Sequence, residues 1–344
     1  MENNRIQDRK RYVCLFVVGT ILLTVVFLLN VGLGSVSIGI KEIISAFCHK
    51  MAISDAHASI IRNIRLPRTL AALAGGACLA VSGLLLQIFF HNPIVEPYIL
   101  GISSGSNLFV GLVMLGGYSF GMTTITSVGM FAGSFFGAMV VMLVVIFASQ
   151  KVKSITTLLI IGLMLGYVCS AATSVLTALA DHEKIANFMM WTMGSFAGFK
   201  WSDVQILYCV GIPFLVGAFL MSKPLNAMLL GEKYAQSMGI SIQTFRFLMV
   251  LVSSVLTAVV TAFAGPVSFI GLAVPHIVRI TFKTSDNRLI LPASCIFGAI
   301  MTGICDLGAR LILSPTELPL GAMTSIIGAP VVVYLLVHKR GGDL

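Results

Sequence analysis

Three arginines stand just before a long apolar segment, and no other residues in this sequence are better suited to recognition chemistry. Arg62, Arg65 and Arg68 recur at every third position, and at that spacing they would share much of one helix face if the helix begins early. A guanidinium group stays charged and can grip a carboxylate with two parallel hydrogen bonds. Two interpretations stay open: a cationic patch for an acidic partner, or side chains that bind lipid head groups at the bilayer surface.

The elements that hold these arginines are membrane helices. Of the 344 residues, 57% are hydrophobic and only 10% are charged, against about 25% charged in an ordinary soluble domain. A soluble protein of this size could not bury so much apolar surface. The whole chain, 1–344, is therefore predicted to be a single all-α, polytopic membrane domain. The net charge of +9 fits loop lysines and arginines that set topology, and no soluble basic domain remains for a nucleic acid.

Nine apolar segments are long enough for a span of about 20 residues, and dividing one longer segment adds a tenth. The stretch 246–282 would form a helix of about 55 Å, too long for a hydrocarbon core of about 30 Å. Gly265-Pro266 breaks it, because proline removes a backbone donor. The predicted spans are 13–33, 69–90, 98–116, 123–148, 155–180, 203–222, 246–264, 267–281, 289–313 and 319–337.

An even number of spans places both termini on one side of the membrane. With the N-terminus inside, most of the 22 lysines and arginines fall on inner segments, as the positive-inside bias requires. Both termini are therefore predicted to be cytoplasmic, and Arg65 and Arg68 face the outside. There they oppose the positive-inside bias and, at a helix N-terminus, the helix dipole, so topology does not explain them.

Four segments stand out in order along the chain: RLPRTLAALAGGACLAVSGLLLQIFFHNPIVEPYILGISSG (65–105), LLGEKYAQSMGISIQTFR (229–246), GPVSFIGLAVPHIVR (265–279) and ELPLGAMTSIIGAPVVVYLL (317–336). Together they resemble the signatures of the type II ABC import permeases (FecCD-like), a family that carries ferric siderophores, haem or cobalamin. One departure is NPIVEPYILG, where family members often have Leu-Ala after Asn-Pro. The resemblance implies ten membrane helices per subunit, which agrees with the spans counted above.

The resemblance also implies a function: the permease subunit of an ATP-driven importer for an iron chelate, with cobalamin as the alternative cargo. Its partners would be a second permease subunit in a homo- or heterodimer, two cytoplasmic ATP-binding subunits and an extracytoplasmic substrate-binding protein, in a bacterial cytoplasmic membrane. The chain is not expected to be an enzyme or to bind a cofactor. ATP and Mg²⁺ would belong to the ATPase, since no phosphate loop G-x-x-x-x-G-K-[ST] occurs here.

Docking of the binding protein is implied for Arg65, Arg68 and Arg310, which match family arginines that meet glutamates on the two lobes of the binding protein. Asp306 precedes Arg310 by four residues and could pair with it along a helix. A purely structural role for that pair therefore stays open.

The inner loop at about 223–246 matches the family segment that docks in a groove of the ATPase. Gly239 is a plausible helix stop, and Ser241 could cap the helix that follows. The alternative is an ordinary loop helix on the membrane surface. The implied coupling residues are Leu230, Gly231, Glu232, Ala235 and Gly239.

A cytoplasmic gate is implied at Asn92, which matches a gate-lining position of the family, with Thr156 or Thr157 nearby. The alternative for Asn92-Pro93 is a simple turn signal. Gly129, Gly133 and Gly137 recur every four residues, a spacing that lets membrane helices approach closely.

Two other classes of function fit the sequence less well. A secondary transporter would need ionisable residues near the membrane midplane, and the predicted spans are nearly charge-free at their centres. An intramembrane enzyme would need paired catalytic groups, and none cluster. His276 has no second ligand in register and is interpreted as structural rather than as a metal site.

Overall fold

The structure, a computed structural model, describes residues 2–34, 55–116, 127–152 and 154–338, and within these ranges it contains helices and no strand. The all-α membrane fold predicted from the sequence is thus confirmed. The long helices are α1 (Glu2–Gly32), α4 (Leu66–Phe89), α5 (Ile102–Gly116), α6 (Ser127–Lys151), α7 (Ile155–Ala178), α9 (Trp201–Leu220), α12 (Ile242–Ala264), α14 (Asn287–Leu311) and α15 (Leu320–His338). The shorter elements are α3 (Asp55–Ser59), the π-helical turn η1 (Ile60–Arg65), the 3-10 turn η2 (Pro97–Leu100), α8 (His182–Thr192), α10 (Ser222–Leu229), α11 (Glu232–Ser237) and α13 (Ile270–Phe282).

Seven helices in the described ranges are long and apolar enough to cross a membrane. Three more apolar helices are shorter, at 102–115, 270–282 and 320–333. Each of the ten predicted spans therefore contains a helix, but these three are shorter than a full span. The largest difference falls at 98–116, where the 3-10 turn η2 comes first and α5 begins only at Ile102. Helix α8 was not predicted.

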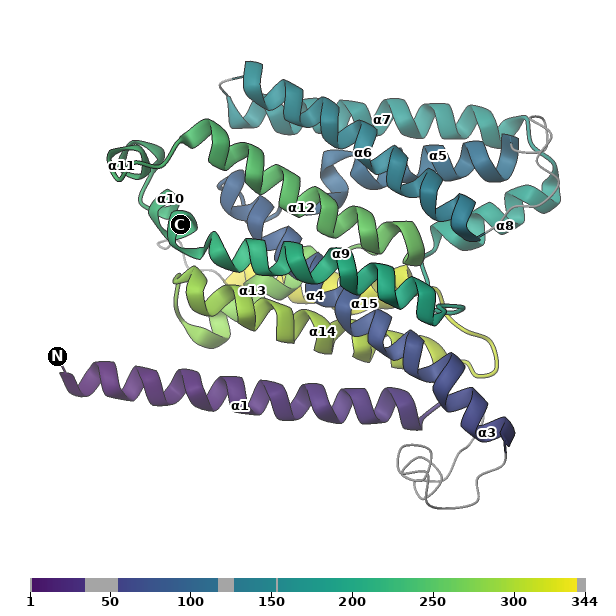
Figure 1. The fold of residues 1–344 in the computed structure, drawn as a ribbon, viewed down its shortest axis with the longest axis horizontal. Helices are drawn as coiled ribbons and strands as arrows, with labels where there is room; N and C mark the ends of the chain where they lie inside the picture. Colours follow the sequence, from purple (N-terminus) through teal and green to yellow (C-terminus); the bar gives the residue numbers. More distant parts are fainter. Residues whose placement is uncertain (1, 35–54, 117–126, 153, 339–344) are drawn as a thin grey trace.

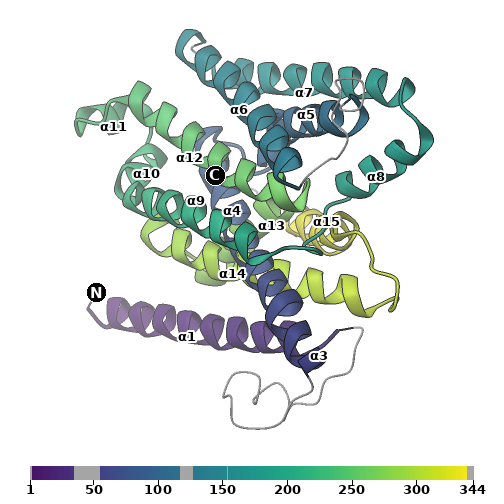
Figure 2. The ribbon, with the colours of Figure 1, turned by 45° about the vertical axis from the view of Figure 1, so that its right-hand side comes forward.

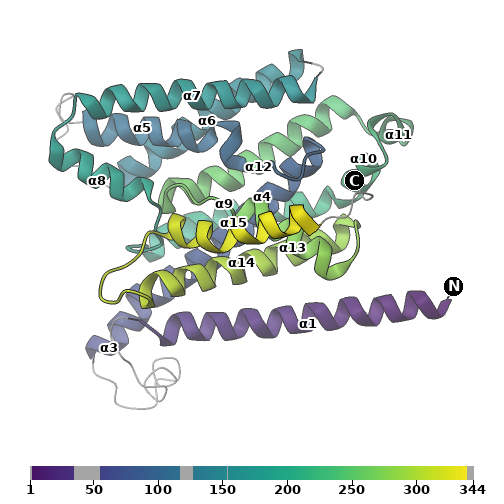
Figure 3. The ribbon, with the colours of Figure 1, turned by 180° about the vertical axis from the view of Figure 1, so that it is seen from behind.

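Helix α4 runs through the middle of the bundle, with α12, α13 and α14 packed around it (Figure 1). Helices α5, α6 and α7 form a layer on one side, and α1 lies along the opposite edge against α14. Figure 2 shows α10 and α11 at one end of this bundle and α8 at the other. The start of α1 and the end of α15 lie at the same end as α10 and α11 (Figures 1 and 3), as an even number of crossings requires.

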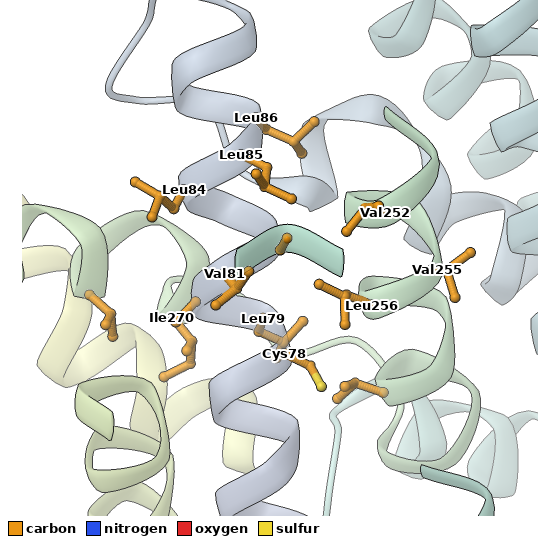
Figure 4. Packing of buried hydrophobic residues seen from close by; sticks show 14 of the residues in the cluster. Cys78, Leu79, Val81, Leu84, Leu85, Leu86, Val252, Val255, Leu256 and Ile270 are labelled. Atoms are coloured by element: carbon orange, nitrogen blue, oxygen red, sulfur yellow. The ribbon is translucent and has the colours of Figure 1, made fainter. Parts of the chain in front are cut away.

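The backbone of α4 touches the backbones of α13 and α14 because glycines meet at both crossings. A Cβ at Gly83 would lie 2.0 Å from the Gly271 carbonyl oxygen, and one at Gly76 would lie 2.3 Å from the Gly298 oxygen. Helices in lipid gain no hydrophobic attraction for one another, so this close van der Waals contact holds them together. The surrounding core is filled by apolar side chains of α4, α12 and α13, including Cys78, Leu79, Val81, Leu84, Val252, Leu256 and Ile270 (Figure 4).

The predicted small-residue spacing on α6 also packs helices closely. A Cβ at Gly137 would lie 2.2 Å from the Gly105 carbonyl oxygen of α5, and one at Gly133 would lie 3.0 Å from the Val113 side chain. The packing role predicted for these two glycines is confirmed, and it holds the α5–α6 layer together.

The helix that carries the arginines begins earlier than the predicted residue 69. It is helical from Asp55 through α3, η1 and α4, and the Leu66 amide donates to the Ile61 carbonyl five residues before it, the pattern of a π-helix. This turn lies just before Pro67, which has no amide to donate. Arg65 and Arg68 therefore lie inside a helical segment that begins at Asp55. The prediction that they lie at a helix N-terminus, where they would oppose the helix dipole, is wrong.

The predicted break at Gly265-Pro266 is confirmed, since α12 ends at Ala264 and α13 follows as a short separate helix. The Ser195 amide donates to the Ala264 carbonyl at 2.8 Å, and the Leu320 amide donates to the Gly194 carbonyl at 3.1 Å. The break, the α8–α9 connection and the start of α15 are thus joined through their backbones. Such bonds are needed because lipid cannot satisfy the polar groups that a broken helix releases.

We expect Gly83→Ala to destabilise the fold, because the new methyl group has no space against the Gly271 carbonyl. Overpacking of this kind costs about 1–3 kcal/mol. The matched control is Gly217→Ala on α9, where a Cβ would meet nothing within 4 Å. Thermal unfolding of the two variants in the same detergent measures the effect. Equal midpoints for Gly83→Ala and wild type would contradict the proposed backbone contact.

Candidate functional site

Asp306 lies buried between two arginines near the C-terminal end of α14. Arg68 of α4 approaches its Oδ1 atom with Nε at 3.1 Å and Nη2 at 3.0 Å, and Arg310 Nε lies 3.3 Å from Oδ2. All three residues are at most 6% exposed. The predicted pairing of Asp306 with Arg310 is confirmed. A buried carboxylate needs charged partners such as these two arginines, because an unpaired buried charge is costly.

Arg65 and a second nitrogen of Arg310 bind the end of α1. Arg65 Nη1 donates to the Val31 and Gly32 carbonyl oxygens at 3.1 and 2.6 Å. Arg310 Nη2 donates to the side-chain Oδ1 of Asn30 at 2.6 Å. The last carbonyls of a helix have no partner within it and carry partial negative charge, so guanidinium groups bind there favourably.

Glu317 is the member of this group that faces water. Its Oε1 accepts a hydrogen bond from Arg68 Nη1 at 2.7 Å, and its side chain is 36% exposed. The arginine cluster therefore joins α1, α4, α14 and the segment before α15. Its members are Asn30, Arg65, Arg68, Asp306, Arg310 and Glu317.

The structure brings the three predicted docking arginines together, but their guanidinium groups are turned into the protein. The expectation that they are exposed is wrong for Arg65, Arg68 and Arg310, because Asp306 and the end of α1 hold them inward. Docking of a binding protein stays a prediction. Sequence reasoning missed Asn30, although a polar side chain near the end of an apolar span is a usable signal.

The predicted inner loop folds as two short helices, α10 and α11, followed by α12. The Gly239 amide donates to the Gln236 carbonyl at 3.0 Å, and the Ile240 amide donates to the Ala235 carbonyl at 3.1 Å. This is a Schellman motif, and Gly239 supplies its left-handed φ of +84°, so the predicted helix stop is confirmed. Ser241 occupies the N-cap position of α12, but its hydroxyl lies 3.1 Å from the Thr244 hydroxyl and caps no backbone amide.

A patch of apolar side chains is exposed on α10, α11 and their flanking residues. Of the predicted coupling residues, Leu230 is in this patch, whereas Gly231 and Gly239 shape the backbone. Glu232 forms an ion pair with Arg246, and Ala235 is buried. We call the patch the inner apolar patch; it consists of Leu229, Leu230, Tyr234 and Met238, which are 43–67% exposed. Tyr234 and Met238 were missed, although their spacing of four residues places them on one helix face.

The predicted gate residues are not joined by any hydrogen bond within the described part of the chain. Asn92 Oδ1 accepts from the Ile94 amide at 3.0 Å, which is the turn that the alternative interpretation expected. Thr156 and Thr157 lie exposed in the first turn of α7, where Ser154 caps the helix through the Thr157 amide. The role of Asn92 and these threonines in a gate stays a prediction.

We expect Asp306→Asn to destabilise the protein, because it removes the only carboxylate that both Arg68 and Arg310 contact within the described residues. Breaking a buried charge pair in this way costs about 3–5 kcal/mol. The control is Asp181→Asn, which breaks an exposed pair with Lys184 and should leave the unfolding temperature nearly unchanged, since exposed pairs contribute little. Equal thermal stability of the two variants would show that the cluster does not hold the helices.

Comparison with known proteins places these features in a family. The chain is 36% identical to the vitamin B12 import system permease protein BtuC of Vibrio parahaemolyticus, over 82% of this chain and 83% of that protein. It is 31% identical to the hemin transport system permease protein HmuU of Yersinia pestis, over 98% of each chain.

A solved structure and a family profile agree with these relatives. The fold matches an inward-facing metal-chelate type ABC transporter with a TM-score of 0.83 and 30% sequence identity, over 94% of this chain and 98% of that one. The profile of the FecCD transport family matches residues 22–338. The chain belongs to the FecCD transport family of ABC importer permeases.

Proposed function

We propose that this permease moves an iron chelate, a ferric siderophore or haem, into the cell. The likeness to HmuU over nearly the whole chain supports an iron-containing cargo, and the likeness to a metal-chelate type transporter supports a metal chelate. The likeness to BtuC favours cobalamin as the alternative cargo. Secondary transport, the remaining alternative, is disfavoured by membership in an ABC importer family.

The inner apolar patch is the observation that carries the ATP-driven part of this proposal. An exposed group of large apolar side chains at one end of the bundle is a typical protein-binding surface, and it lies at the end where α1 begins and α15 finishes (Figure 1). Topology predicts that this end is cytoplasmic. We infer that a separate ATPase subunit binds there, because the chain has no phosphate loop of its own.

A second permease subunit is proposed to cover the side of the molecule where α7 carries polar side chains. Thr173, Ser174 and Thr177 follow one another along α7, and most of this helix is exposed in the single chain. Polar side chains in membrane helices usually face protein or a water-filled space, which favours an assembly over direct contact of this face with lipid.

The substrate-binding protein is proposed to dock at the arginine cluster. Since the guanidinium groups point inward, a partner carboxylate would approach Arg68 from the side where Glu317 is exposed. Glu317 would then compete with the acidic residue of the partner for the same guanidinium group.

The proposed function is tested by uptake into vesicles that contain the permease, its ATPase and its binding protein. We expect ATP-dependent uptake of a ferric siderophore or haem. Uptake of cobalamin alone would favour the alternative cargo, and uptake driven by an ion gradient without ATP would favour a secondary transporter.

In the same assay, the double variant Leu230→Asp with Met238→Asp should lower ATP hydrolysis stimulated by the binding protein about tenfold or more. Both side chains are over 60% exposed, so the variant should fold, and each buried apolar side chain at an interface contributes about 1.5–3 kcal/mol. Leu179→Asp, at an 82% exposed position at the far end of α7, is the control. Full stimulation in the double variant would exclude the inner apolar patch as the ATPase site.

The docking proposal predicts that Glu317→Gln strengthens association with the binding protein, because it removes the internal competitor for Arg68. An exposed ion pair contributes about 0.2–1 kcal/mol, so the affinity should rise about 1.4-fold to fivefold at low salt. Glu183→Gln removes the same charge from the exposed face of α8 and controls for general electrostatic attraction. An equal effect of both variants would exclude a specific contact with Arg68.

A further inference from the structure

Helix α10 of the inner loop packs against α14 at the end of the bundle where the inner apolar patch is exposed (Figure 2). The side chains of Leu225, Ala227 and Met228 are buried in this contact region, whereas Leu229, the last residue of α10, belongs to the inner apolar patch. Apolar packing has no preferred direction. It therefore does not by itself fix where α10 lies along α14.

The side chain of Asn226 supplies a directional contact between these two helices. Its Nδ2 donates to Asp286 Oδ1 at 2.6 Å, and its Oδ1 accepts from the backbone amide and the side-chain Nδ2 of Asn287 at 2.8 and 2.9 Å. Among the residues that the structure describes, no other side chain of α10 is hydrogen bonded to another helix. We call this contact the Asn226 joint; it consists of Asn226, Asp286 and Asn287.

The Asn226 joint caps α14 from outside that helix. Asn287 is the first residue of α14, and the first amides of a helix have no acceptor within it. The Asp286 side chain, at the N-cap position, accepts from the Arg288 amide at 3.0 Å, so the Asn287 amide is left to Asn226. Asn287 is only 1% exposed, and a buried amide without an acceptor would be costly. A residue of the inner loop thus completes the start of α14.

Helix α14 connects the Asn226 joint with the arginine cluster. It has 25 residues and is therefore about 37 Å long, and Asp306 and Arg310 near its C-terminal end belong to that cluster. The other polar contact of the inner loop, from Arg246 to Glu232, joins α11 to the start of α12, only 14 residues away in the chain. Among the described residues, Asn226 is therefore the polar link from the inner loop to the helix that carries the arginine cluster.

We propose that Asn226 is a positioning residue for ATPase coupling. It fixes α10 and the adjoining inner apolar patch to the start of α14, so that docking of the binding protein at the other end of α14 is transmitted to the ATPase. Packed helices and hydrogen-bond networks can carry such coupling between distant sites. This inference rests on the proposed function, since it takes the ATPase to bind the inner apolar patch and the binding protein to dock at the arginine cluster.

Two exchanges between nitrogen and oxygen test the joint. Asn226→Asp replaces the donating Nδ2 by an oxygen and sets a carboxylate against Asp286, which the repulsion of like charges opposes. It keeps an oxygen that can accept from Asn287. Asp286→Asn keeps an acceptor for Asn226 and a residue type suited to the N-cap. The double variant has one donor and one acceptor again, with their roles exchanged, so the four proteins form a double-mutant cycle.

The measured quantity is the stimulation ratio: ATP hydrolysis by the assembled complex with the binding protein, divided by hydrolysis without it. Asn226→Asp should lower this ratio about threefold or more, because a hydrogen bond to a charged group is replaced by repulsion. Asp286→Asn should keep most of the stimulation, and the double variant should recover it. The affinity of the permease for the ATPase should change less than the ratio does, since the inner apolar patch itself is unaltered.

A stimulation ratio that Asn226→Asp leaves unchanged would overturn the proposal. A ratio that Asp286→Asn does not restore in the double variant would also overturn it, because the effect would then not come from the joint. The same holds for a lowered ratio that weaker binding of the ATPase accounts for entirely, since Asn226 would then act on binding and not on coupling.

Hydrogen exchange of the same complexes, without ATP or cargo, tests the joint directly. The amides of residues 222–229 and 287–290 should exchange about threefold faster or more in Asn226→Asp, because local opening governs their rates, and the double variant should return them to the wild-type rates. Unchanged exchange in Asn226→Asp would overturn the proposal. If the wild-type complex shows no stimulation by the binding protein, the proposed function fails, and the exchange rates decide separately whether Asn226 fixes α10.

Discussion

The contact on which most of this structure depends is the backbone-to-backbone crossing of α4 with α13 and α14. Lipid offers helices no hydrophobic incentive to associate, so stability must come from close packing and polar contacts. Gly76 and Gly83 let the partner backbones approach to distances that any Cβ would prevent. Because α13 is held against α4 at Gly271, the start of α13 has a defined position. The hydrogen bond from the Phe269 amide to the Glu96 side chain follows from that position.

The arginine cluster has a different role from the glycine crossings. Helix α1 is largely exposed along its length. Apolar contact with lipid or with neighbouring helices does not fix its position along its own axis. Directional bonds from Arg65 and Arg310 to the end of α1 do fix it. Replacing buried ion pairs by apolar residues is often neutral or stabilising, so we infer that these charges are retained for register or for recognition rather than for stability alone.

Polar and apolar groups are distributed unevenly along the length of the bundle. The end near α3 holds the charged cluster, whose one exposed carboxylate, Glu317, faces water. The opposite end exposes the inner apolar patch. The break at Gly265-Pro266 links these regions, because it connects through backbone bonds to the start of α15 and the α8–α9 connection.

The sequence by itself determined the membrane class, the ten apolar helices, the Gly265-Pro266 break, the Gly239 stop and the Asp306–Arg310 pair. These follow from local composition, from proline and glycine geometry and from spacing along one helix. Only the tertiary structure decided that Arg65, Arg68 and Arg310 point inward. Arg65 and Arg310 bind the end of α1, a separate helix. Arg68 binds Glu317, which lies 249 residues away in the chain. It also decided that Glu96, in what the sequence indicates is an inner loop, accepts a hydrogen bond from the Phe269 amide at the start of α13. A side chain's partner and depth depend on how helices cross, and the crossings here depend on glycine contacts between distant segments that no local pattern encodes.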